Sequence, residues 1–264
     1  MLKASRMVCP ALLALLAVPS RAAVREISSM SELLPELSTG TLLVFDIDNT
    51  LIEPAGNAGS DQWYYYLQKA FRRDGLDPKQ AEAKAAESWT RALDVVEPKA
   101  VEALTPGLIR VQQERGISVM ALTARGPEDA PATFRQLSAI GVDLGARAPS
   151  ALVLRGSAAG LPEGRAGLYE NGVLFVGEGP EKGKALAAFL GKLGLRPARV
   201  VFVDDKPHHA RNVDAALASA GIPGAAFRYG AADAKVRAFN TGGLYGFELR
   251  EAPGLIQINL TDYD

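Results

Sequence analysis

The chain has few side chains that could form disulfides or bind soft metal ions. It contains one cysteine, Cys9, and two histidines, His208 and His209. Cys9 lies in an amino-terminal segment that we expect to be removed, so we expect no disulfide, zinc–thiolate site or cysteine nucleophile in the mature protein. The two histidines are neighbours and cannot both face one metal ion from a regular helix, so we interpret them as exposed loop residues.

A surplus of positive charge is also missing. The chain has 29 lysines and arginines against 30 aspartates and glutamates, which gives a net charge of −1. Binding to nucleic acid depends on a basic surface that neutralises phosphates, so we expect no nucleic-acid partner. The apolar fraction of 48% is that of an ordinary globular protein with a full core.

No apolar run is long enough to cross a membrane. Residues 7–18 form an apolar run of about a dozen residues, whereas a spanning helix needs about 20. Lys3 and Arg6 precede this run, and Ser20-Arg21-Ala22 offers the small residues of a cleavage site. We therefore predict a signal peptide over residues 1–22, with an uncleaved membrane anchor as the alternative. The mature protein is expected to be exported to the periplasm or secreted, with no membrane span.

Beyond residue 40 the chain alternates between apolar strands and amphipathic helices. We expect strands at residues 41–45, 117–122, 199–203 and 225–229, and helices at residues 107–115, 128–140, 182–193 and 210–220. Ser29 and Glu32 have the spacing of a capping box and predict a short helix before the first strand. Asn171-Gly172 predicts a hairpin with a type I′ turn. The alternation predicts an α/β fold, a three-layer Rossmann-like core with a parallel sheet.

One long stretch interrupts this alternation after the first strand. Residues 61 to about 103 have helical spacing without a strand pattern, and residues 99–104 are expected to form a short last helix. Trp63 and Tyr64 are expected to pack in a core, whereas Tyr65 or Tyr66 could face a cleft. We predict a small all-helical cap at residues 55–105, inserted into a core domain formed by residues 23–54 and 106–264.

Polar side chains follow four of the apolar segments or open the next helix. Asp46 and Asp48 follow residues 42–45; the others are Thr123 and Arg125, Lys182, and Asp204 with Asp205. Asp46 and Asp48 are two residues apart in an extended segment, so their side chains can point the same way. Two carboxylates in one small space repel each other unless a cation or a shared proton intervenes.

The order of these four motifs resembles that of the haloacid dehalogenase superfamily of phosphatases and phosphotransferases. The family signature is Asp-x-Asp-x-Thr, then a threonine or serine, a lysine and paired acids, and all four motifs occur here within residues 42–205. The resemblance implies that Asp46 is the nucleophile that forms an aspartyl phosphate and that Asp48 is the general acid and base. It also implies that Thr123 holds a phosphoryl oxygen and that Lys182 offsets negative charge.

The same resemblance implies a magnesium ion as cofactor. Its ligands would be Asp46, the backbone carbonyl of Asp48 and an acid of the fourth motif, because Mg²⁺ prefers oxygen ligands. Asp205 matches the position of the direct ligand best, with Asp204 helping directly or through water. The chain departs from the family pattern at His209, where many relatives have asparagine or aspartate.

Each of these residues also has a purely structural interpretation. Asp46 and Asp48 could end a strand in a turn, and Thr123 or the pair Asp204-Asp205 could cap the following helix. Lys182 differs from these, because it opens a helix whose dipole disfavours a cation. A nearby anion explains its position better.

The sequence therefore predicts a Mg²⁺-dependent phosphomonoester hydrolase that acts on a small phosphorylated substrate. A phosphotransferase or phosphomutase of the same superfamily shares every motif, and a non-catalytic protein that binds phosphate or metal is the alternative from another class. A dehalogenase would need neither Asp48 nor the acids Asp204 and Asp205. Export favours hydrolysis, because water is the usual acceptor outside the cytoplasm.

Overall fold

An eight-stranded sheet forms the centre of the protein. The computed structural model describes residues 24–179 and 181–239, so the predicted signal peptide and residues 240–264 of the predicted core domain lie outside the described residues. The strand order is β1 (Arg25–Ile27), β10 (Gly224–Tyr229), β9 (Arg199–Asp204), β2 (Thr41–Phe45), β5 (Ser118–Thr123), β8 (Val173–Phe175), β7 (Leu168–Glu170) and β6 (Leu154–Arg155). The first six strands of this order are parallel, and β7 and β6 add an antiparallel edge.

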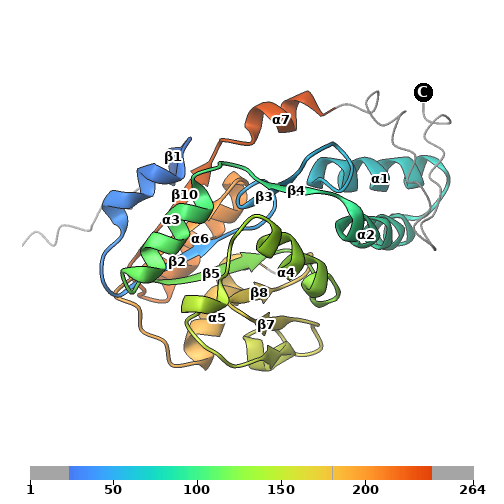
Figure 1. Cartoon of the computed structure of the whole chain (residues 1–264). Coiled ribbons are helices and arrows are strands. Elements are labelled where there is room, and N and C mark those ends of the chain that lie inside the picture. The colour runs from blue at the N-terminus through green and yellow to red at the C-terminus, as the bar shows by residue number, and fades with distance from the viewer. Residues whose placement is uncertain (1–23, 180, 240–264) are drawn as a thin grey trace, which may run out of the picture.

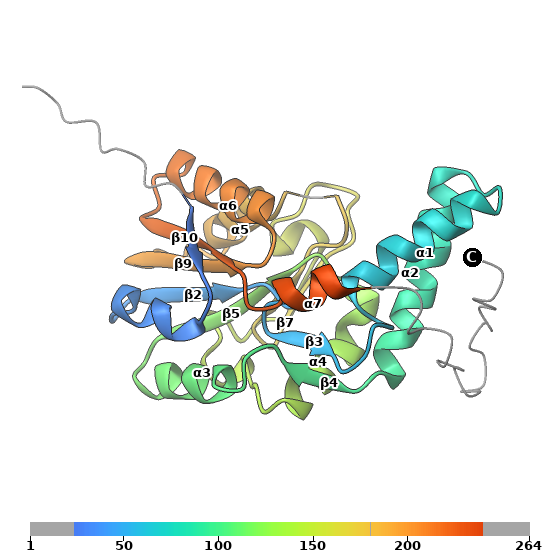
Figure 2. The same ribbon diagram turned by 90° about the horizontal axis from the view of Figure 1, so that it is seen from above.

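Helices cover both faces of the sheet, which confirms the predicted α/β Rossmann-like fold (Figures 1 and 2). Strand β2 shows how the two faces form. Leu43 and Phe45 pack in one apolar cluster with η1 (Met30–Glu36), α3 (Thr105–Glu114) and α4 (Ala130–Ala139). Leu42 and Val44 pack in the other cluster with α5 (Lys182–Lys192) and α6 (Pro207–Ser219). A strand buried on both sides is continuously apolar, as residues 42–45 of β2 are.

The insert after β2 contains a helical hairpin on a two-stranded ribbon. The hairpin consists of α1 (Asp61–Arg73) and α2 (Pro78–Val95), which pack through their own apolar cluster. The ribbon pairs β3 (Ile52–Pro54) with β4 (Pro98–Ala100) in antiparallel fashion. The prediction of a helix at residues 99–104, in an interval without strands, is therefore wrong. Pairing between segments on either side of a long insert leaves no local periodicity that a sequence pattern could reveal.

Local predictions elsewhere agree with the structure. Ser29 and Glu32 form the expected capping box at the start of η1. Asn171 and Gly172 have φ angles of +46° and +77°, as a type I′ turn between β7 and β8 requires. The edge strand β1 was not predicted, because three residues are too few to show a period. The remaining elements are η2 (Pro127–Asp129), η3 (Gly145–Arg147), η4 (Gly156–Ala159) and α7 (Asp233–Ala238). Over residues 24–179 and 181–239, no helix has the length and apolar character needed to cross a bilayer.

The connections reverse direction at β2, and this reversal locates the ligand site. From β2 the chain proceeds to β5 on one side, and later strands return to place β9 on the other side. Phe45 at the end of β2 lies opposite Val203 near the end of β9, so both strands end at the same edge. Parallel α/β sheets bind ligands at such a switch point. The helical hairpin projects beyond this edge of the sheet (Figure 2).

Candidate active site

Three predicted acids converge where β2 and β9 end. Asp46 follows the last residue of β2, Asp204 is the last residue of β9, and Asp205 comes next. One carboxylate oxygen of each lies within 4.8 Å of those of the other two. The backbone fixes this arrangement, because the Asp46 amide donates a hydrogen bond to the Val203 carbonyl over 2.8 Å.

A buried cation lies between two of these acids. The Nζ atom of Lys182 donates to Asp46 Oδ1 over 2.5 Å and to Asp204 Oδ2 over 2.7 Å. The Lys182 side chain is only 2% exposed. Burial opposes its charge, but the two carboxylates outweigh burial and raise the pKa of Lys182. Lys182 is thus a charged component of the site, as the position at a helix start predicted.

Close packing of two helices holds Lys182 in place. Its neighbour Gly183 donates from its amide to Asn212 Oδ1 over 2.6 Å. A Cβ atom on Gly183 would lie 2.5 Å from the Asn212 carbonyl oxygen and 2.7 Å from Ala216 Cβ. Glycine therefore allows the first turn of α5 to rest on α6. Asn212 supports the helix that carries the lysine.

The three carboxyl groups have unequal acidities. Burial raises the pKa of Asp46 to about 7; Lys182 opposes this shift and Asp204 adds to it. Burial and the nearby Asp46 also raise the pKa of Asp205 well above its usual range. Asp204 differs, because Lys182 and the His209 hydrogen bond outweigh burial and lower its pKa to about 2. Without a further cation, these acids cannot all be ionised at neutral pH without a large electrostatic cost.

Asp205 has an oxygen atom that is suited to bind a metal ion. Among the described residues, Asp205 Oδ1 is buried without a hydrogen-bond partner. Both oxygens of Asp204 are already occupied, by Lys182, His209 and the Lys206 amide. Three carboxylates and one ammonium leave two negative charges, which is the charge that one Mg²⁺ ion neutralises. Oxygen donors with excess negative charge fit Mg²⁺, and the unpaired oxygen favours Asp205 over Asp204 as the direct ligand.

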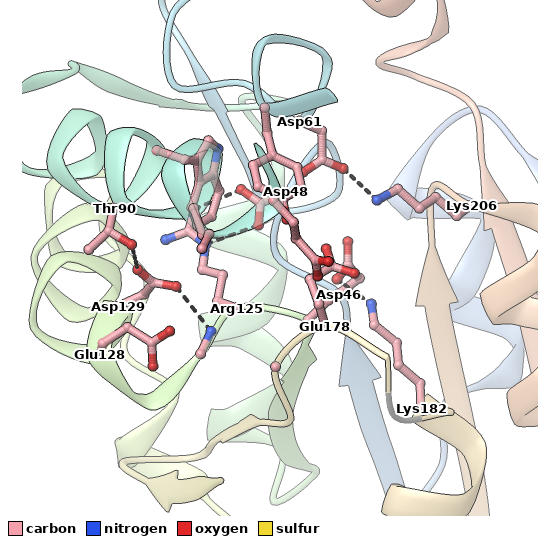
Figure 3. Close-up of a pocket in the computed structure, with 18 of the residues that line it drawn as sticks. Asp46, Asp48, Asp61, Thr90, Arg125, Glu128, Asp129, Glu178, Lys182 and Lys206 are labelled. Carbon is pink, nitrogen blue, oxygen red and sulfur yellow. Dashed lines mark hydrogen bonds and ion pairs between the residues drawn. The ribbon is translucent and has the colours of Figure 1, made fainter. Parts of the chain in front are cut away.

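Asp48 lies on the same cavity but pairs with a different cation. Arg125 Nη2 donates to Asp48 Oδ1 over 2.7 Å, and Nε donates to Oδ2 over 3.0 Å. Figure 3 shows Arg125 reaching Asp48 on one side and Lys182 reaching Asp46 on the other. Thr123 is fully buried, and its hydroxyl accepts a hydrogen bond from the Arg125 amide over 3.1 Å. This contact closes the turn after β5, and the following helices begin at the caps Gly126 and Asp129, so the interpretation of Thr123 as a helix cap is wrong. Its role in holding a phosphoryl oxygen stays a prediction.

Two further residues of the site were not assigned a role from the sequence. Thr50 Oγ1 donates to Asp46 Oδ2 over 3.3 Å and accepts from the Asp205 amide over 3.1 Å, which links the two acidic motifs. The Asp-x-Asp-x-Thr pattern contained the signal for this residue. His209 is in α6, with Nδ1 3.2 Å from Asp204 Oδ2, so the interpretation of His209 as an exposed loop residue is wrong. Burial lowers the pKa of His209, which favours the neutral ring.

A cavity of about 370 Å³ opens between this edge of the sheet and the helical hairpin. Tyr64 and Trp89 give it an aromatic wall, although Tyr64 also packs in the hairpin core as predicted. Tyr65 is 41% exposed and does not line the cavity. The charged residues that line the cavity are Asp46, Asp48, Asp61, Lys79, Glu82, Arg125, Glu128, Asp129, Glu178, Lys182 and Lys206.

Comparisons with known proteins give a family and two structural likenesses. A candidate β-phosphoglucomutase from Thermotoga maritima is 14% identical, with a TM-score of 0.39, over 75% of this chain and 100% of that one. A haloacid dehalogenase-like hydrolase from Streptococcus pneumoniae is 15% identical, with a TM-score of 0.40, over 76% of this chain and 92% of that one. No curated protein matches the sequence. The family described as "Protein of unknown function (DUF2608)" matches residues 23–244, so the chain belongs to the DUF2608 family.

Proposed function

We propose that this protein is a Mg²⁺-dependent phosphomonoester hydrolase of the haloacid dehalogenase type. The observation that carries the proposal is the convergence of Asp46, Asp205 and Lys182 beside a cavity at the switch point of a parallel sheet. The order of the four motifs along the chain supports the same reaction. A nucleophilic carboxylate, a buried ammonium and an acidic metal site together suit transfer of a dianionic phosphoryl group.

Asp46 is the nucleophile in this proposal. Its carboxylate attacks the phosphorus atom, the bond from phosphorus to the ester oxygen breaks, and an aspartyl phosphate forms. Lys182 and Thr50, which donate to the two Asp46 oxygens, fix the direction of the carboxylate. When bound, Mg²⁺ would supply positive charge to the phosphoryl oxygens, held by Asp46 and Asp205.

Asp48 moves the proton in both half-reactions. It delivers a proton to the departing ester oxygen, and it then takes a proton from the water molecule that hydrolyses the aspartyl phosphate. Such proton transfer contributes about 10²- to 10⁴-fold to the rate. The side chain of Asp48 lines the cavity and is 17% exposed, so a bound substrate could reach it.

The cavity supports a small substrate. A volume of about 370 Å³ lies at the lower end of the range for small-molecule sites, about 300–1,000 Å³. The helical hairpin covers the cavity on the side opposite the sheet edge that carries Asp46. This cover favours a small metabolite over a phosphorylated protein as the substrate. We also propose that the enzyme acts outside the cytoplasm, because residues 1–22 have the pattern of a signal peptide.

Hydrolysis of 4-nitrophenyl phosphate tests this function. The purified protein should release nitrophenol only with Mg²⁺, and Asp46→Asn should lower kcat/KM by about 10³-fold or more. Asp143→Asn, an identical change at an exposed carboxylate, should have no effect. Full activity of the Asp46→Asn variant, or Mg²⁺ binding without any turnover by the wild type, would refute the proposal.

A further inference from the structure

Two buried cations divide the carboxylates of the site into two groups. Lys182 binds Asp46 and Asp204, whereas Arg125 binds Asp48. The Arg125 side chain is 2% exposed. Burying an arginine destabilises the folded protein unless its hydrogen-bond donors are paired. The contacts of Arg125 are therefore part of the structure of the site.

The pairing of Arg125 with Asp48 uses both carboxylate oxygens. The contact to Oδ1 is 2.7 Å long and the contact to Oδ2 is 3.0 Å long. This parallel geometry between a guanidinium and a carboxylate fixes the plane of the carboxylate as well as its position. A carboxyl group that later carries a proton on Oδ2 still has Oδ1 as an acceptor, so the shorter contact can persist.

Arg125 itself is fixed by residues outside the acidic cluster. Its Nη1 atom donates to Thr133 Oγ1 and to Gln136 Oε1, each over 2.9 Å. Its guanidinium carbon also lies 5.3 Å from the ring centre of Trp89 on the hairpin. These contacts leave Nε and Nη2 directed at Asp48, so Arg125 is the fixed member of the pair.

The same anchors connect Arg125 to the helical hairpin. The side-chain amide of Gln136 accepts from Arg125 and donates from Nε2 to the Leu93 carbonyl in α2 over 3.0 Å. Beside it, Thr90 in α2 donates to Asp129 Oδ1 over 2.7 Å, as Figure 3 shows. The position of Asp48 therefore depends on how α2 packs against α4 and η2.

We propose that Arg125 is a positioning residue for proton transfer by Asp48. It anchors Asp48 through Oδ1, while Oδ2 gives a proton to the departing ester oxygen and regains one from the attacking water. This inference rests on the proposed function, because it assigns a role within that reaction. The motif resemblance assigns no role to an arginine at this position, and Gln136 and Thr133 act only through Arg125.

The dependence of the rate on the leaving group distinguishes positioning from a general structural role. 4-Nitrophenol leaves readily as an anion, whereas phenol, which lacks the nitro group and is the stronger base as its anion, depends more on a proton donor. Arg125→Lys keeps the charge but loses the parallel geometry. It should lower kcat/KM for phenyl phosphate by about tenfold or more, and for 4-nitrophenyl phosphate by less than about threefold.

A double-mutant cycle makes the test specific to Asp48. In an Asp48→Asn background, Arg125→Lys should cause no further selective loss on phenyl phosphate, because the group that it positions is already gone. Gln136→Met is a second variant, outside the cavity lining, and should give the same selective loss at a smaller size. Arg110→Lys, the same change at an exposed arginine in α3, should leave both rates unchanged.

The outcomes distinguish the role of Arg125 from the proposed function. Equal losses on both substrates, or the same loss with and without Asp48, would overturn the role of Arg125 and leave the proposed function intact. An unchanged leaving-group dependence in both Arg125→Lys and Gln136→Met would also overturn that role. Absence of Mg²⁺-dependent turnover of 4-nitrophenyl phosphate by the wild type would overturn the function and this inference together.

Discussion

Lys182 Nζ donates to Asp46 Oδ1 over 2.5 Å, in an environment where both side chains are at least nine-tenths buried. The lysine also pairs with Asp204, so one positive charge is shared by two carboxylates, while Asp205 Oδ1 is buried without a hydrogen-bond partner among the described residues. This shortage of positive charge is the central electrostatic feature of the site. It makes the protonation of Asp46 and the binding of a divalent cation alternatives to each other.

The pH dependence of stability follows from the raised pKa of Asp46. In the folded, metal-free protein this pKa is about 7, against 3.8 ordinarily, so the folded state holds the proton more tightly than the unfolded chain. The stabilisation of the folded state by the protonated Asp46 is therefore fully present below about pH 4 and is lost as the pH rises through about 7. In EDTA, the free energy of unfolding of the wild type should fall relative to Asp46→Asn by about 2 kcal/mol from about pH 5 to pH 7.

Urea unfolding of both proteins across this range measures the difference. Taking the difference between the two proteins cancels the contributions of the histidines, whose lowered pKa values act in the opposite direction. A difference that is flat from about pH 5 to pH 7 would contradict the account. Addition of Mg²⁺ should stabilise the wild type more strongly as the pH rises, because protons compete with the metal ion for the carboxylate.

Metal binding should depend on Asp205 independently of catalysis. Asp205→Asn removes one carboxylate from a cluster with excess negative charge, so the metal-free variant should be at least as stable as the wild type. Its affinity for Mg²⁺ should fall by at least about tenfold, and the rise in Tm that Mg²⁺ causes should largely disappear. Calorimetry and thermal unfolding measure both quantities, with Asp143→Asn as the control that keeps the full effect. An undiminished rise in Tm would exclude Asp205 as a ligand.

A methyl group at Gly183 should displace Lys182. Gly183→Ala puts a Cβ atom against Asn212 and Ala216, so it should destabilise the protein by about 1–3 kcal/mol and lower the activity. Gly191→Ala is the matched change in the same helix, where nothing lies within 4 Å. Gly191 lies in the last turn of α5, so that substitution should leave the stability unchanged or raise it by less than about 1 kcal/mol. Similar effects of the two variants in urea unfolding would show that the packing at Gly183 does not hold the lysine.

The sequence was sufficient for the part of the site that backbone geometry determines. Apolar runs that stop at Asp46 and at Asp204 predict two buried parallel strands, and such strands bring their following residues to one edge of the sheet. The capping box at Ser29 and the turn at Asn171 were predictable for a similar reason, because each depends on a few adjacent residues.

Several contacts that the sequence did not predict join distant segments. The pairing of β3 with β4, and the position of Trp89 on the cavity wall, depend on how the hairpin folds back on the core. Arg125 was recognised as a polar residue after a strand, but its partner Asp48 follows a different strand. His209 was misassigned because its contact with Asp204 depends on where α6 begins.

The most direct test of the account is detection of the aspartyl phosphate. The wild-type protein is mixed with excess phenyl phosphate and Mg²⁺, quenched in acid within one turnover, digested and analysed by mass spectrometry. We predict the added mass of one phosphoryl group on the peptide that contains Asp46, lost on brief exposure to base and absent in Asp46→Asn. In Asp48→Asn, 4-nitrophenyl phosphate should still phosphorylate Asp46, because 4-nitrophenol leaves as an anion, while hydrolysis of the aspartyl phosphate is slowed. Turnover of this substrate by Asp48→Asn without a phosphorylated peptide, or a phosphoryl group on another residue, would contradict the account.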